Sequence, residues 1–282
     1  MTRGWLRMCG RYAATRDPAT LAAEFDAIDG TDALGGSAPG PDYNVAPTKP
    51  VLAVVERHPR DPDGEPDPTR TERSVRVMRW GLVPAWAKDP AVGSRMINAR
   101  AETAAEKPAY RTSLARRRCL LPTDGWYEWK KEDGRRQPYY VTPPDGSSLV
   151  LAGVWTTWRP PDLADDAPPL ITCAVITTDA VGQLADVHER MPLMLPRELW
   201  SAWLDPARTE VEELLRPTDD AFVAALELRP VSSAVNNVRN NGPQLVARVD
   251  PGADPAPALD QPRRRGRRPA PETPELALFD HP

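Results

Sequence analysis

The chain has few of the residues from which disulfide frameworks and metal centres are built. Its three cysteines, Cys9, Cys119 and Cys173, lie far apart and form no C-x-x-C pair. This odd number and wide spacing argue against a disulfide framework and against a structural zinc site. We therefore expect a reduced protein that needs no metal and no cofactor.

Long apolar segments are also lacking. No run of 18 apolar residues occurs, so the sequence predicts no membrane-spanning helix. The opening stretch "MTRGWLRM" is basic but has no apolar centre, which argues against a secretory signal. These features predict a cytoplasmic protein. The net charge of −4 does not exclude a nucleic-acid partner, because a local basic groove is sufficient for binding.

Proline, in contrast, is abundant. The 34 prolines are about 12% of the chain, against a usual share near 5%. They cluster in "HPRDPDGEPDPTR", in "PPDLADDAPP" and in the last part of the chain, which indicates loops and a tail around an ordinary folded domain. We expect residues 249–282, rich in proline and arginine, to be disordered.

The rest of the chain alternates strand and helix patterns. "VLAVV" and "SVRVMRWGLVP" predict strands, as do several later segments from "RCLLP" to "LITCAVITT". Helices are predicted for "DPATLAAEFDAI", for two pieces of "INARAETAAEKPAYRTSLARRR", and for "PRELWSAWL" and "ARTEVEELLR". This irregular mixture favours an α+β fold or a closed β architecture over a doubly wound sheet.

Four short stretches place polar residues among residues that look buried: "MCGRYA", "INARAE", "DGWYEW" and "HERMP". Each has an ordinary interpretation. Glu128 is typical of a strand residue facing solvent, His188 of a structural histidine, and Asn98 of a helix cap. Cys9 is typical of a small core residue.

Taken together and in order, the motifs resemble one family, the SRAP (SOS response-associated peptidase) proteins, which process abasic sites in single-stranded DNA. The resemblance extends approximately from Cys9 to Gln244. It implies a mostly β pseudo-barrel with flanking helices and a positively charged cleft for DNA. The motifs that carry it are "MCGRY", "YNVAPT", "RWGLVPAWAKDP", "INARAET", "CLLPTDGWYEWK", "HERMP" and "AVNNVRNNG".

The chemistry of Cys9 agrees with this resemblance. If translation begins at Met8 and the methionine is removed, Cys9 carries a free α-amine beside its thiol. The usual pKa values, about 7.7 to 8.0 for the amine and about 8.5 for the thiol, leave some of each nucleophile available near neutral pH. The amine can form a Schiff base with the aldehyde of an open abasic sugar, and the thiol can then close a thiazolidine ring. The result would be a covalent DNA–protein crosslink that shields the lesion during the response to DNA damage.

Opening the abasic sugar requires proton transfer. His188 titrates near neutral pH, and a glutamate set among tryptophans, Glu128, can have a raised pKa. By its match to the asparagine of the family, Asn98 would orient the amine or the sugar. The predicted catalytic residues are therefore Cys9, Asn98, Glu128 and His188.

Candidate DNA contacts lie in the same motifs. We expect the arginines to contact phosphates without reading sequence, and the tryptophans to stack on bases unless they fill the core. Pro47 resembles the family residue that abuts the bases beside the lesion. The predicted DNA-binding residues are Arg11, Pro47, Trp80, Trp86, Arg100, Trp129 and Arg190.

Two other functions fit the same residues. Cys9 and His188 could form the nucleophile–base pair of a cysteine peptidase that acts on other proteins. Alternatively, the groove could bind single-stranded DNA without catalysis. The resemblance itself also implies self-processing peptidase activity and DNA lyase or crosslink-reversal activity.

The predicted organisation has three parts. Residues 1–8 form an extension absent from the mature protein, either because Met8 is the true start or because self-processing removes it. Residues 9–248 form the catalytic and DNA-binding domain, and residues 249–282 the tail. We expect a monomer associated with the nucleoid.

The tail carries a short apolar motif, "PELALF". Leu276, Leu278 and Phe279 resemble the peptide with which bacterial repair proteins bind the sliding clamp, although Glu275 replaces the usual glutamine. The nearby "RRRGRR" can add non-specific attraction to phosphates, or can be a solvated charge run.

Overall fold

The computed structural model describes residues 9–34, 37–61, 63–132, 135–160 and 168–250. The expected extension (residues 1–8) and almost all of the expected tail, with its clamp-like motif, lie outside the described residues. Among the residues that are described, no helix is long and apolar enough to cross a membrane.

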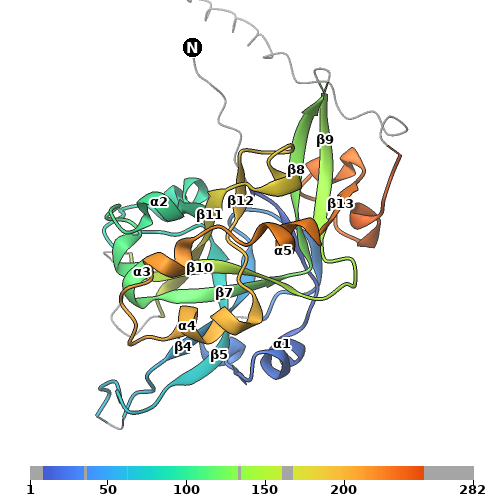
Figure 1. The fold of residues 1–282 in the computed structure, drawn as a ribbon. Coiled ribbons are helices and arrows are strands. Elements are labelled where there is room, and N and C mark those ends of the chain that lie inside the picture. The colour runs from blue at the N-terminus through green and yellow to red at the C-terminus, as the bar shows by residue number, and fades with distance from the viewer. Residues whose placement is uncertain (1–8, 35–36, 62, 133–134, 161–167, 251–282) are drawn as a thin grey trace, which may run out of the picture.

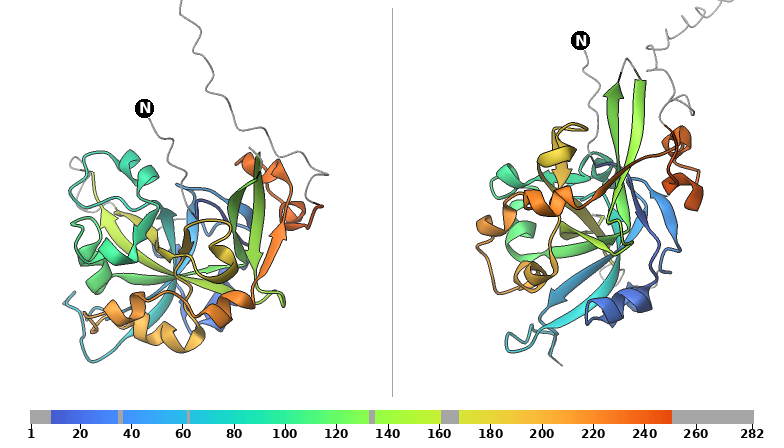
Figure 2. Two further views of the ribbon diagram at one scale, coloured as in Figure 1. Left: turned by 45° about the horizontal axis from the view of Figure 1, so that its top comes forward. Right: turned by 45° about the vertical axis from the view of Figure 1, so that its right-hand side comes forward.

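Two sheets build the fold (Figure 1). In the smaller sheet the strand order is β13-β9-β8-β1-β3. Its members are β1 (Tyr12–Ala14), β3 (Asp42–Val45), β8 (Gly125–Glu132), β9 (Arg135–Thr142) and β13 (Glu227–Pro230). The β8–β9 hairpin projects at the top of the molecule in Figure 1 and in the right-hand view of Figure 2.

The larger sheet has the order β12-β11-β10-β7-β4-β5-β2, with β6 attached to β11. Its members are β2 (Ile28–Asp29), β4 (Pro50–Arg57), β5 (Glu72–Trp80), β6 (Asn98–Arg100), β7 (Arg118–Thr123), β10 (Leu149–Trp158), β11 (Leu170–Asp179) and β12 (Arg190–Pro192).

This sheet closes on itself. The end of β5 pairs in parallel with β11, through Arg79 opposite Thr172 and Trp80 opposite Cys173. The ring β11-β10-β7-β4-β5 is thus a small barrel. Successive strand residues point to opposite faces, so one face of each strand lines the interior. The cluster that includes Val51, Met78, Trp80, Leu121, Trp155 and Val175 fills it.

Short helices cover the outside of the barrel. The α-helices are α1 (Pro18–Glu24), α2 (Ala101–Ala104), α3 (Arg111–Arg116), α4 (Trp200–Leu204) and α5 (Asp220–Ala224). The segments Thr31–Leu34, Pro90–Arg95, Gly182–Leu184, Arg197–Leu199, Glu212–Leu215, Ser233–Asn236 and Pro243–Val246 form 3-10 turns. The prediction of a mostly β, barrel-like α+β fold with flanking helices is confirmed.

Two helix predictions need correction. The first residues of "INARAET" form the strand β6 rather than a helix, because they pair with β11. "ARTEVEELLR" contains only a 3-10 turn, Glu212–Leu215. Val211, beside this turn, is a β-branched residue that favours helix weakly, and Pro217 follows it closely, so the segment does not extend into an α-helix.

Candidate active site

Cys9 and Glu128 meet in the interior. The backbone N–H of Cys9 donates a hydrogen bond to Oε1 of Glu128 at 2.9 Å. Along β8 the side chains alternate between the two faces of the sheet, and Glu128 therefore points to the same side as Trp126, two residues earlier. Both side chains are buried, with Glu128 only 4% exposed and Trp126 only 1% exposed. The alternative of a solvent-facing Glu128 is therefore wrong.

Burial governs the protonation of this pair. It raises the pKa of Glu128 to about 7, although the hydrogen bonds from the Cys9 thiol and backbone act in the opposite direction. Burial also raises the pKa of the Cys9 thiol well above its usual value, and the charge of Glu128 raises it further. Glu128 can therefore exchange a proton near neutral pH, while Cys9 keeps its proton as a thiol.

The backbone of Cys9 is unusual. Its φ is +42°, in the left-handed region that side chains other than glycine rarely occupy. The residue is only 5% exposed and belongs to the barrel-side core with Tyr12, Trp126 and Ile97. Its thiol and its backbone nitrogen are thus held together against the carboxyl group of Glu128.

His188 lies in the loop before β12. Its Nδ1 is 3.0 Å from the backbone nitrogen of Arg190, which must donate the hydrogen bond. Nδ1 is then the acceptor, so the proton of the neutral ring is on Nε2. Partial burial lowers the pKa of His188, and the neighbouring charge of Lys131, on the same strand as Glu128, lowers it too. Near neutral pH, His188 therefore presents an Nε2–H donor.

Arg190 has internal partners for its guanidinium. Nη1 and Nη2 bind the carboxylate of Glu102 at 2.7 and 2.9 Å, Nη1 also reaches Asp179 at 2.5 Å, and Nη2 reaches the carbonyl of Thr177 at 2.6 Å. These contacts join α2, β11 and β12 directly beside His188. No sequence motif predicted this arrangement, because Glu102 lies 88 residues from Arg190 and Asp179 belongs to a different strand.

Asn98 is the first residue of β6. This strand runs parallel to β11, with Asn98 opposite Val175, and the phenol of Tyr110 donates to the Asn98 carbonyl at 3.1 Å. The cap of helix α2 is Arg100, which makes no side-chain capping bond. The alternative that Asn98 caps this helix is therefore wrong, and the side chain of Asn98 is placed by the sheet.

Arg11 supports one rim of the site. Its guanidinium donates to Oδ1 of Asn44 at 2.7 Å and to the carbonyl of Val235 at 2.8 Å. The amide of Asn44, fully buried, donates in turn to the carbonyls of Asn237 and Asn240 at 3.0 and 2.9 Å. These bonds hold the "AVNNVRNNG" segment against β1 and β3. The two motifs "YNVAPT" and "AVNNVRNNG" are thus parts of one scaffold, which spacing alone did not reveal.

The three tryptophans expected at the DNA differ in exposure. Trp80 is completely buried, and its indole donates to the carbonyl of Ile97 at 3.0 Å, so it fills the barrel and offers no surface to a base. Trp86, in contrast, is 68% exposed. Trp129 is half-buried, and its indole donates to Oδ1 of Asn236 at 2.7 Å.

Two further residues expected at the DNA lie partly or wholly at the surface. Arg100 is exposed at the end of β6. Pro47 is half-buried in the turn between β3 and β4, where the N–H of Lys49 donates to the carbonyl of Ala46 at 3.2 Å. Both are accessible to a bound strand.

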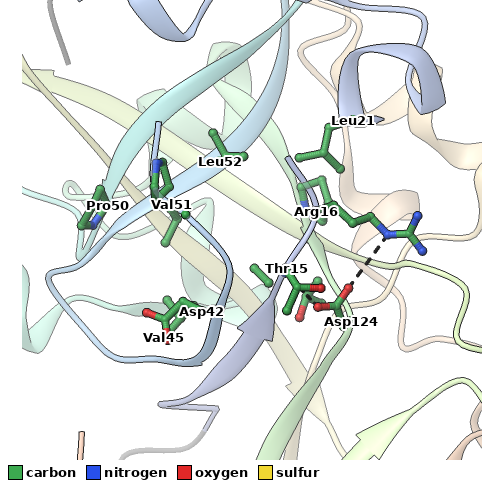
Figure 3. A pocket seen from close by; sticks show the side chains of 14 residues that line it. Thr15, Arg16, Leu21, Asp42, Val45, Pro50, Val51, Leu52 and Asp124 are labelled. Atoms are coloured by element: carbon green, nitrogen blue, oxygen red, sulfur yellow. Dashed lines mark hydrogen bonds and ion pairs between the residues drawn. The ribbon is translucent and has the colours of Figure 1, made fainter. Parts of the chain in front are cut away.

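A separate small cavity lies at the other end of β1 (Figure 3). Thr15, Arg16, Leu21 and Asp124 are among its lining residues, and Arg16 Nε is 3.9 Å from Asp124. Its volume of about 30 Å³ suits one or two water molecules but not a nucleotide. It is therefore not the place for a DNA lesion. Within the described part of the chain, no group of three or more His, Cys, Asp or Glu side chains could hold a metal ion.

Comparisons with known proteins show the family of the chain. A family model described as "SOS response associated peptidase (SRAP)" matches residues 8–238. The abasic site processing protein YoqW of Bacillus subtilis is 36% identical over 247 residues, which cover 85% of this chain and 99% of that protein. The abasic site processing protein HMCES of Pongo abelii is 33% identical over 285 residues, covering 86% of this chain and 77% of that protein.

A solved structure shows the same fold. The crystal structure of a protein from Bacteroides thetaiotaomicron superposes with a TM-score of 0.67 at 25% identity, over 86% of this chain and all of that chain. The family match covers the barrel, Cys9, Glu128 and His188. The chain therefore belongs to the SOS response associated peptidase (SRAP) family.

Proposed function

We propose that the protein recognises abasic sites in single-stranded DNA and traps them covalently through Cys9. The observation that carries this proposal is the contact between the Cys9 backbone nitrogen and the carboxyl group of Glu128. In a chain that begins at Cys9, this nitrogen is an α-amine. The names of the relatives, which are abasic site processing proteins, support the same substrate.

The proposed reaction uses both groups of Cys9. The amine adds to the C1′ aldehyde of the open sugar, and loss of water gives a Schiff base. The thiol then adds to the same carbon, its proton passes to the nitrogen, and a thiazolidine ring results. Glu128, with a pKa of about 7, can take a proton from the ammonium group and return it to the departing water.

His188 would assist the opening of the sugar. Its Nε2–H can donate to the ring oxygen as the closed hemiacetal opens, and the bond from Arg190 to Nδ1 fixes this orientation. In this proposal Asn98 orients the sugar, and Arg190 positions His188 rather than binding a phosphate, because its guanidinium is occupied by Glu102 and Asp179.

The remaining surface residues would bind the strand. Arg100 is the accessible candidate for a phosphate contact, Trp86 and Trp129 for base stacking, and Pro47 for a wedge beside the lesion. Arg11 contributes by holding the Asn236-containing segment in place.

A peptidase acting on other proteins is less well supported. Such an enzyme needs a cysteine with a lowered pKa, activated by an imidazole. Here burial and Glu128 raise the pKa of Cys9. Cleavage in front of Cys9 within the same chain, and reversal of the crosslink, remain part of the proposal as activities of this one site.

A crosslinking assay tests the proposal. A chain expressed from Met8 should leave a band on abasic single-stranded DNA that resists heat and SDS. Cys9→Ser should abolish the band and keep the affinity for DNA, whereas Cys119→Ser, which alters a buried thiol on β7, should keep both. Absence of a resistant band with the unmodified protein would refute the proposed function.

A further inference from the structure

Several arginines gather at one end of the barrel, and within the described part of the chain no carboxylate pairs with them. Arg57 ends β4 and Arg117 precedes β7, and both continue the inward-facing rows of their strands. Their guanidinium carbons lie 5.2 and 5.7 Å from the ring centre of Trp155. Two cations therefore stack on one buried tryptophan, which holds them in fixed positions.

Around this pair lies a recess of about 320 Å³, which we call the arginine recess. Arg57, His58, Arg60, Arg116 and Arg117 supply its basic lining, with Pro66, Pro206 and Glu56. Arg57, Arg60 and Arg116 are exposed, so the recess is open to solvent.

The carboxylate that lines the recess, Glu56, already pairs with an arginine outside it. Glu56 binds Nε and Nη2 of Arg73 at 3.0 and 2.8 Å. Among the described residues, no carboxylate forms an ion pair with Arg57, Arg60 or Arg117.

The guanidinium groups in and near the recess repel one another. Partial burial of its guanidinium lowers the pKa of Arg57, and the positive charges of Arg117, Arg76 and Arg60 lower it further. Like charges held this closely destabilise the free protein, and an anion placed between them would relieve the repulsion.

The chemistry of the recess favours phosphate. Guanidinium groups bind phosphate oxygens through paired hydrogen bonds, and several fixed guanidiniums suit a ligand with more than one charged oxygen. Trp155 is only 4% exposed, so no aromatic face is available to a base. Such a site would bind a backbone without reading sequence.

The recess is distant from the catalytic residues. Figure 1 shows the end of β4 at the lower left, away from the β8–β9 hairpin at the top, and Figure 2 shows the same separation. Glu128 belongs to that hairpin.

We propose that the arginine recess is a second phosphate-binding site, which holds phosphate groups of the DNA strand at a distance from the lesion. The choice of DNA as the source of these phosphates rests on the proposed function. The binding of a phosphate group itself does not rest on the proposed function. The experiment separates DNA phosphate from free phosphate as the ligand.

The test removes two rim arginines and leaves the Trp155 stack intact. Arg60→Gln with Arg116→Gln is compared with a matched control, Arg197→Gln with Arg216→Gln, two exposed arginines that do not line the recess. Affinity for an intact single-stranded 25-mer is measured over a range of salt concentrations. Each lost phosphate contact should lower the slope of log K against log salt by about 0.7, so the recess variant should lose about 1.4 and the control nothing.

A second arm uses pyrophosphate without DNA. The unmodified protein and the control should gain thermal stability with pyrophosphate, and the recess variant should gain less. An unchanged pyrophosphate effect together with an unchanged slope would overturn the proposal. A change with pyrophosphate alone would overturn the assignment to DNA, and stabilisation by polyglutamate but not by pyrophosphate would overturn the phosphate site.

These outcomes are separate from the fate of the proposed function. The covalent band depends on Cys9, and the recess variant should reach the same final yield of crosslink at saturating DNA. If no protein variant forms a crosslink, the proposed function fails, and the pyrophosphate arm still decides the nature of the recess.

Discussion

At the scale of single residues, the burial of Glu128 has a direct effect on proton transfer at the site. The side chain is a carboxyl group that accepts a hydrogen bond from the backbone nitrogen of Cys9 with almost no access to water, and its pKa is raised to about 7. As the pH rises through 7, the ionised form that accepts protons accumulates. The pH dependence of the proposed reaction should therefore report on this group as well as on the amine.

The rate of crosslinking should rise as the pH passes through about 7, and again near the pKa of the amine, about 7.7 to 8.0. Glu128→Gln should remove the first of these steps and slow the reaction by roughly 10²–10⁴-fold. Single-turnover kinetics on abasic DNA between pH 5 and 9 would show this. A first step that persists in Glu128→Gln would assign it to another group.

The same carboxyl group should affect stability. Its pKa rises from 4.5 in the unfolded chain to about 7 in the folded protein, so the folded state binds the proton more strongly. The stabilising effect is complete below pH 4.5 and is lost as the pH rises through 7, by on the order of 3 kcal/mol. Glu128→Gln should flatten this dependence in urea unfolding measured from pH 4.5 to 8, and an unchanged pH profile would contradict it.

Motif order singles out the candidate site residues, whose catalytic roles stay predictions, but it does not predict their surroundings. Motif order led to Cys9, Asn98, Glu128 and His188. The burial of Trp80 against β11 and the ion pair of Arg190 with Glu102 depend on contacts between segments about 90 residues apart. No local pattern in the chain encodes such contacts.

At the scale of elements, the barrel interior is closely packed where β7 meets β10. Gly153 lies opposite Cys119, and a Cβ added to Gly153 would be 2.8 Å from the Cys119 sulfur and 3.0 Å from Leu121 Cδ1. These contacts are too short, and neighbouring strand residues cannot move apart freely in a closed barrel. Glycine is thus required here for lack of space.

Gly153→Ala should lower the free energy of unfolding by about 1–3 kcal/mol. Adding Cys119→Ala should recover part of the loss, because the smaller side chain vacates space. Urea unfolding of the two single variants and the double variant gives the coupling energy, which should be about 0.5 kcal/mol or more. Strictly additive losses would refute the steric explanation.

The β11–β12 pair is secured by Arg190. Arg190→Lys loses the paired bonds to Glu102, and since Glu102 and Asp179 are themselves 47% and 77% exposed, the cost should be about 1–2 kcal/mol. Arg248→Lys, which alters an exposed pair with Glu227, should cost less than about 1 kcal/mol.

Thermal unfolding measures the loss of stability in both variants. DNA affinity distinguishes a structural role of Arg190 from a phosphate-binding role. A large decrease in the salt slope of DNA binding with unchanged stability would show that Arg190 binds phosphate instead.

Element predictions succeeded where one pattern dominated. The alternation in "SVRVMRWGLVP" became β5, and the Asp17 cap with Pro18 began α1. They failed where tertiary pairing overrode local preference, as in β6, whose residues resemble the start of a helix but pair with β11. The pairing of β5 with β11 closes the barrel. No pattern in either segment predicts that the two strands pair.

At the scale of the whole molecule, the proposed function requires that the mature chain begin at Cys9. A protein expressed from Met1 should form no crosslink until residues 1–8 are removed, because its cysteine nitrogen is an amide. Intact mass spectrometry alongside the crosslinking assay would follow this. Crosslinking by a chain whose mass still includes Met1 would contradict the role of the amine.

The backbone conformation of Cys9 has a free-energy cost that depends on whether residue 8 is attached. A torsion φ exists only where a carbonyl carbon precedes the nitrogen, so a first residue has none. The left-handed conformation of Cys9 costs on the order of 1–3 kcal/mol while residue 8 is attached, and nothing afterwards. In the proposed processing, removal of residue 8 would release this backbone strain before any DNA binds.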